Sequence, residues 1–71
     1  MNAPEWLAAY ADKLGVPAPS SEEIDAVLAL AGVAAHASER IAAPVACWMS
    51  ARAGVNLTDA MRLAQEVGGD A

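Results

Sequence analysis

The sequence has few of the residues that small proteins use for cross-linking, metal binding or catalysis. Its 71 residues include one cysteine, Cys47, one histidine, His36, and no phenylalanine. One cysteine cannot form a disulfide within the chain, and with one histidine it cannot supply the three or four ligands of a zinc site. General acid–base catalysis needs a positioned pair of groups in a pocket that excludes water. We therefore expect no metal, no other cofactor, no catalytic residue and no enzymatic activity.

Basic residues and long apolar runs are also scarce. Four Lys and Arg against nine Asp and Glu give a formal net charge of −5, whereas binding to a phosphate backbone needs clustered basic side chains. The longest uncharged apolar stretch, residues 26–35, is half of the roughly 20 residues that cross a bilayer. The amino terminus lacks the basic and then apolar pattern of a signal peptide. We expect no nucleic-acid partner, no membrane association and a cytoplasmic location.

The composition instead favours a small helical protein. Hydrophobic residues make up 56% of the chain but aromatic residues only 4%, so most of the apolar side chains are small ones that favour helix and close helix packing. A chain this short holds one core, and its burial of apolar surface is nearly balanced by the entropy lost on folding. We expect residues 1–71 to form a single domain that gains stability from a partner or a second copy.

The first two helices have clear start signals. Asn2 as N-cap, Pro4 in the first turn and Gly15 at the end predict a helix over 4–14. Residues 16–20 contain two prolines and predict a stiff, non-helical connector. Ser20 and Glu23 have the spacing of a capping box, which starts a second helix over 21–40. The predicted core stripe of this helix consists of Ile24, Val27, Leu28, Ala31 and Ala35. Because residues 26–35 are apolar on every face, this helix needs cover on more than one side.

Proline and glycine also bound the other two helices. Pro44 as first residue and Gly54 as C-cap predict a helix over 44–53, with Trp48 in the core. Asn56 as N-cap predicts a fourth helix over 57–67, followed by a frayed tail at 68–71. The predicted fold is an all-α, compact four-helix domain in which the helices over 21–40 and 44–53 are central.

Candidate binding residues lie near the end of the second predicted helix. His36 and Arg40 are four residues apart and would share one helix face. They would then form a binding spot for a carboxylate or phosphate, or a switch near physiological pH. The alternative is structural: His36 bonds a backbone carbonyl, while Arg40 supports the helix dipole and pairs with Glu39 or Asp59. A Glu39–His36 metal pair would need the same pattern on several helices, so we expect no metal there.

Three further side chains have two interpretations each. Cys47 lies among apolar residues and is expected to be a small buried hydrophobe rather than a nucleophile. Trp48 is large enough to anchor the core, which we expect, or a partner, and with Arg52 four residues on it has the spacing for a cation–π contact. Trp6 is either a lid on the core or an anchor for a partner, because it lies at one end of the domain.

A longer pattern runs through residues 27–67 and the first helix. It consists of Leu28-Ala-Leu-Ala-Gly-Val-Ala-Ala-His36, Arg40, Ala42-Ala43-Pro44 and Ala53-Gly54, preceded by Trp6-Leu7 and Leu14-Gly15. In these positions the sequence resembles a family of small actinobacterial domains of unknown function. Members of that family occur alone or at the carboxyl end of the guanylyltransferase that attaches a guanine dinucleotide to molybdopterin. The resemblance implies an accessory part in molybdenum cofactor maturation or molybdoenzyme assembly, and it marks His36, Arg40 and Pro44.

Three functions remain open at the level of the sequence. The first is a non-catalytic interaction module that docks on a larger enzyme or other protein. The second is a self-associating helical bundle, a homo-oligomer with no other ligand. The third is a binder of a small anion at His36 and Arg40.

Overall fold

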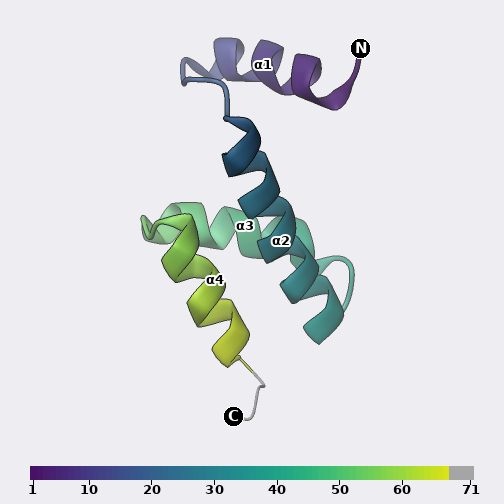
Figure 1. Cartoon of the computed structure of the whole chain (residues 1–71), viewed down its shortest axis with the longest axis vertical. Helices are drawn as coiled ribbons and strands as arrows, with labels where there is room; N and C mark the ends of the chain where they lie inside the picture. Colours follow the sequence, from purple (N-terminus) through teal and green to yellow (C-terminus); the bar gives the residue numbers. More distant parts are fainter. Residues whose placement is uncertain (68–71) are drawn as a thin grey trace.

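Four α-helices make up about three quarters of the chain that the structure, a computed structural model, describes, which is residues 1–67. They are α1 (Ala3–Leu14), α2 (Ser21–Ala37), α3 (Ala42–Ala53) and α4 (Leu57–Glu66), as Figure 1 shows. These residues contain no β-strand, so the all-α, four-helix prediction is confirmed. The tail predicted at 68–71 lies outside the described residues.

The helix starts follow from local hydrogen bonds that the sequence predicts. The Ser20 amide donates to Glu23 Oε1 at 2.8 Å, and the Glu23 amide donates to Ser20 Oγ at 3.0 Å. Asn2 and Glu5 form the same reciprocal pair at the start of α1. At α4 the Asp59 amide donates to Asn56 Oδ1 at 2.8 Å. Each cap satisfies amide groups that the helix itself leaves without a partner.

Glycine ends α1 and α3 as predicted. Gly15 has φ of 78° and Gly54 has φ of 75°, both in the left-handed region. Their amides donate to carbonyls of the preceding turn, including Asp12 O for Gly15 and Ala51 O for Gly54. A residue with a Cβ would be strained in this conformation, so both positions favour glycine.

The connection between α2 and α3 differs from its prediction. α2 ends at Ala37 rather than at residue 40, because Ser38 leaves the helical region and its Oγ donates to Ala34 O at 2.8 Å. α3 begins at Ala42, two residues before the predicted start. Pro44 is therefore the third residue of α3, which the helix tolerates because its first four amides need no partner within the helix.

α2 is the helix against which the others pack. It contacts α3 on one side and α4 on another, which confirms that α2 and α3 are central and that α2 needs cover on more than one side. Leu30 is 1% exposed, and Cys47 Sγ lies 3.9 Å from Val27 O between α2 and α3. The predicted core stripe was partly wrong, because Leu28 is 62% exposed and Leu30 takes its place in the core.

α1 lies apart from the other helices, across the N-terminal end of α2 (Figure 1). The connector over residues 16–20 is non-helical, as its two prolines predict. Ala11 is the buried residue of α1. The molecule measures 40 × 23 × 18 Å along its principal axes. Within the described residues, no helix is both long and apolar enough to cross a membrane.

Candidate functional site

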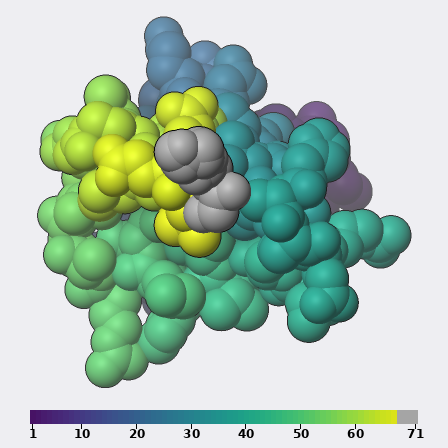
Figure 2. All heavy atoms as spheres, turned by 90° about the horizontal axis from the view of Figure 1, so that it is seen from below, coloured from purple at the N-terminus to yellow at the C-terminus, as the bar shows by residue number. Residues whose placement is uncertain are grey.

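An apolar groove opens between α2, α3 and α4. It has a volume of about 460 Å³ and is formed by the C-terminal half of α2, one face of α3, Val55 and the second half of α4. Its lining is Leu30, Val33, Ala34, Ala37, Ser38, Ala42, Ala46, Met49, Ser50, Ala53, Val55, Ala60, Leu63, Ala64 and Val67. Figure 2 views this end of the molecule, with the end of α4 in yellow and the end of α2 in teal on either side.

The groove offers neither charge nor free hydroxyl groups to a ligand. None of its lining residues is charged. Its two serines already donate within their own helices, Ser38 Oγ to Ala34 O at 2.8 Å and Ser50 Oγ to Ala46 O at 2.9 Å. A volume of this size far exceeds the water-sized voids of a packed protein interior. The groove therefore suits an apolar occupant.

Leu63 stands on one wall of the groove, where an occupant would meet it. The side chain is 43% exposed, and Met49 of α3, which lines the same groove, is exposed as well. Exposed apolar groups that line one hollow are typical of binding surfaces rather than of scattered surface residues.

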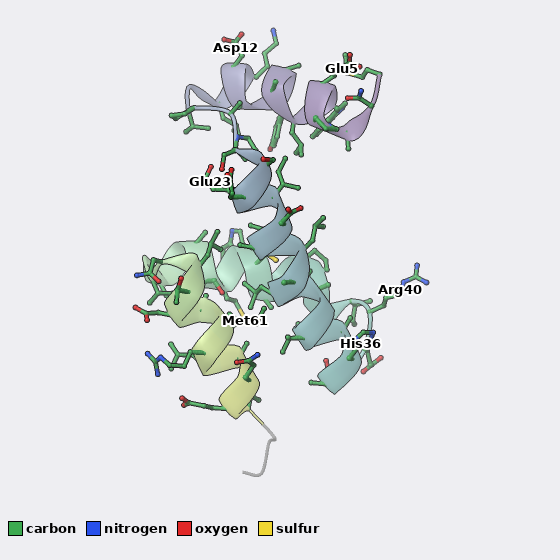
Figure 3. All side chains as sticks on the ribbon, viewed as in Figure 1. Glu5, Asp12, Glu23, His36, Arg40 and Met61 are labelled. Atoms are coloured by element: carbon green, nitrogen blue, oxygen red, sulfur yellow. The ribbon has the colours of Figure 1, made fainter. Side chains whose placement is uncertain are left out.

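The three polar residues predicted to bind a ligand do not form a pocket. His36 lies in the last turn of α2, whereas Glu39 and Arg40 lie in the turn before α3. The prediction that His36 and Arg40 share one helix face was therefore wrong, because α2 ends at Ala37. All three side chains are exposed, and Arg40 points outward from the turn (Figure 3).

The predicted structural partners of Arg40 differ as well. Asp59 pairs with Arg62 at 3.7 Å, and Arg62 also contacts Glu66 at 3.4 Å. Among residues 1–67, no ion pair or side-chain hydrogen bond joins Arg40 to Glu39 or to Asp59. Arg40 is placed by backbone contacts instead, since its carbonyl accepts a hydrogen bond from the Ala43 amide at 3.2 Å.

Trp48 lies on the outer face of α3 rather than in the core. It is 60% exposed, so the prediction of a core position was wrong. The predicted cation–π contact is confirmed, because the Arg52 guanidinium lies 5.1 Å from the ring centroid. Ile41 and Val45, three to seven positions before Trp48, are also exposed and continue an apolar stripe along this face.

Trp6 belongs to an exposed apolar stripe on α1. It is 52% exposed, and its ring centroid lies 5.0 Å from that of Tyr10, with the rings tilted by 34°. Leu14 continues the stripe and is more than half exposed. Glu5 and Asp12 point away from the rest of the molecule (Figure 3), which leaves the charged and apolar sides of α1 separate. We call Trp6, Tyr10 and Leu14 the α1 stripe.

Among residues 1–67, the remaining titratable residues do not gather into a metal site. In the part of the chain that is described, no group of three or more His, Cys, Asp or Glu side chains could hold a metal ion. Cys47 is half-buried and faces the Val27 carbonyl. This surrounding fits the predicted role as a small hydrophobe in the α2–α3 contact.

The sequence predicted that α2 is apolar on more than one face, but it did not predict the groove. A clue lay in α4, where Leu63, Ala64 and Val67 lie at helical spacing near Ala60. The groove forms because α4 packs against α2 but does not cover the small side chains of α3. The angle at which α4 crosses α2 depends on tertiary packing rather than on the spacing of residues within α4.

One of the three comparisons with known proteins gives a match, and it covers nearly the whole chain. The model of a family described as a domain of unknown function (DUF6457) matches residues 1–69. No curated protein and no solved structure matches the chain.

Proposed function

The chain belongs to the DUF6457 family, and we propose that it is a non-catalytic interaction module whose apolar groove binds a helix of a larger enzyme. The observation that carries this proposal is the uncharged groove between α2, α3 and α4. A helix laid into an apolar groove is a recurring mode of peptide recognition. The occupant expected there is an amphipathic helix whose apolar residues repeat every three or four positions.

The proposed partner is an enzyme of molybdenum cofactor maturation, in the cytoplasm of an actinobacterium. The support for this partner is the resemblance of residues 27–67 to domains that occur at the carboxyl end of molybdenum cofactor guanylyltransferase. In that arrangement a small domain would be held beside a catalytic domain, and its groove would receive a helix of the enzyme.

Arg40 is the proposed polar contact at the rim of this interface. Its turn connects Ser38 and Ala42, which both line the groove, and its side chain points outward (Figure 3). Interfaces typically surround an apolar centre with a polar rim. His36 and Glu39, also exposed next to this turn, would belong to the same rim.

A calorimetric titration against the purified guanylyltransferase of the same organism tests the proposal. We expect wild type to bind and Leu63→Glu, which places a charge in the groove, to lose at least about tenfold in affinity. Arg40→Ala should lose less, because rim charges contribute mainly to association rate. The matched control is Val45→Glu, which adds the same charge to an exposed residue that does not line the groove.

Two results would contradict the proposal. One is the absence of binding by wild type. The other is an equal loss for Leu63→Glu and Val45→Glu, because the groove would then not be the contact.

A further inference from the structure

Within residues 1–67, the α1 stripe and the apolar groove are two apolar surfaces that no other part of the chain covers. We propose that in the isolated protein α1 of a second copy occupies the groove, and that the exchange is reciprocal. This inference rests on the proposed function only in taking the groove as a helix-binding surface. It adds that self-association and enzyme binding compete for the groove.

The position of α1 prevents it from filling the groove of its own chain. α1 crosses the N-terminal end of α2 (Figure 1), whereas the groove begins at Leu30 and extends to Ser38. Leu30 lies about 14 Å along the helix from Ser21, at about 1.5 Å per residue. Pro17 and Pro19 fix φ in the short connector and hold α1 at that end.

A twofold axis that sets two copies antiparallel brings the two surfaces together twice. In that arrangement the N-terminal end of α2, with α1 across it, meets the C-terminal end of the other α2, where the groove lies. Each α1 stripe then faces the other copy's groove, as an isologous interface requires. An exchange of identical elements is a known route to a dimer.

The charges at the two ends of α2 favour the antiparallel arrangement. The N-terminal end carries Glu22, Glu23 and Asp25. Beyond the C-terminal end lies Arg40, with Glu39 as the one acid beside it and His36 in the last turn. An antiparallel pair places the acidic end of one copy beside the Arg40 turn of the other, where Glu39 and Arg40 balance in charge, while a parallel pair would place acid beside acid. Avoiding contact between like charges sets orientation more than affinity.

The exposed area of the chain is large enough for such an interface. The chain exposes 5410 Å², whereas the scaling for compact monomers gives roughly 4,100 Å² at this mass of 7.2 kDa. The exposed area therefore exceeds that of a compact monomer by about 1,300 Å². Each partner in a stable complex buries roughly 800 Å². None of the groove's lining residues is charged, so the net charge of −5 on each copy does not lie in the groove itself.

Sedimentation equilibrium of the full chain tests this dimer. We expect wild type to reach twice the chain mass as its concentration rises. Trp6→Ser and Leu63→Glu should each raise the dimer dissociation constant by at least about 30-fold, equivalent to about 2 kcal/mol at 1.4 kcal/mol per tenfold. Trp48→Ser is the matched control, since Trp48 is also an exposed tryptophan but lies on the outer face of α3.

Mixing the two variants tests the exchange itself. The Leu63→Glu chain keeps an intact α1 stripe and the Trp6→Ser chain keeps an intact groove, so their mixture retains one of the two contacts. We expect the mixture to dimerise more strongly than either variant alone. Circular dichroism of each variant should show unchanged helix content, which separates loss of contact from loss of fold.

Three outcomes would overturn the inference: a wild-type monomer at every concentration, a dimer that resists Leu63→Glu, or a dimer that Trp48→Ser breaks and Trp6→Ser does not. Failure here is distinct from failure of the proposed function. A monomer that still binds the guanylyltransferase through Leu63 removes only the dimer, whereas a dimer that never binds the enzyme removes only the proposed partner.

Discussion

At the scale of single residues, burial is concentrated in very few side chains. Among residues 1–67, the buried hydrophobic residues are Ala11, Leu30 and Ala60, and Leu30 is the largest of them. Ala60 is the buried residue of α4, and its small side chain suits the contact with α2, because helices that approach closely need small side chains there. Most large apolar side chains keep part of their surface exposed, and Leu30 is the exception at 1%.

Replacing Gly54 or Gly32 by alanine should change the free energy of unfolding in opposite directions. Gly54 ends α3 at φ of 75°, while Gly32 lies inside α2, and a Cβ at either position would meet no atom within 4 Å. Gly54→Ala should therefore lower the free energy of unfolding by about 1–2 kcal/mol through backbone strain alone. Gly32→Ala should raise it by about 0.5–1 kcal/mol, because alanine loses less backbone freedom in a helix.

Urea unfolding followed by circular dichroism at one protein concentration measures both changes. A shift of the same sign for the two variants would contradict the assignment of Gly54 to a left-handed cap and Gly32 to a regular helix. Gly15→Ala provides a second instance of the cap, since Gly15 has the same left-handed conformation.

At the scale of the elements, the sequence predicted a helix start correctly where an N-cap side chain bonds an amide three residues further on. Asn2, Ser20 and Asn56 all accept the amide hydrogen bonds that their sequence spacing predicts. The end of α2 was missed because Ser38 and Glu39 have no strong stop signal, and helix propensity continues smoothly through Arg40. The start of α3 was placed two residues late because proline is allowed anywhere in the first turn, not only at its first position.

Substituting each of the two adjacent serines at the start of α2 tests whether the Ser20 N-cap stabilises this helix. Ser20 Oγ accepts from the Glu23 amide at 3.0 Å, whereas Ser21 Oγ contacts the Glu22 side chain at 3.3 Å. Ser20→Ala should lower the free energy of unfolding by about 1 kcal/mol because an amide loses its partner. Ser21→Ala should change it by less than about 0.5 kcal/mol, as for an ordinary surface substitution. Equal effects in thermal unfolding would show that the cap does not stabilise α2.

The candidate site was less predictable than the helices. His36, Glu39 and Arg40 were selected for their chemistry, and the turn after Ala37 separates them. Trp48 was assigned to the core because of its size, but α3 turns that side outward and presents Cys47 and Ala46 toward the interior, where both are half-buried. Which face of a short, nearly uncharged helix is buried depends on its neighbours, so the sequence of α3 alone could not select it.

At the scale of the whole molecule, residues 1–67 leave apolar surface at opposite ends of α2, in addition to the outer face of α3. The groove lies at the C-terminal end of α2 and the α1 stripe lies at the other end. A chain of this size gains little stability from its own core, and covering either surface would add to it. The dimer and the enzyme complex are two ways to cover the same groove, so binding of the enzyme should release α1.

The most direct measurement is photo-cross-linking from position 63, with a benzophenone side chain introduced in place of Leu63 and, as control, in place of Val45. For the chain alone, mass spectrometry should place the cross-link from position 63 on residues 6–14 of a second copy. Adding the guanylyltransferase should reduce this product and give a cross-link to a helix of the enzyme, while position 45 gives neither. Cross-links from position 45 and none from position 63 would contradict the assignment of the groove as the binding surface.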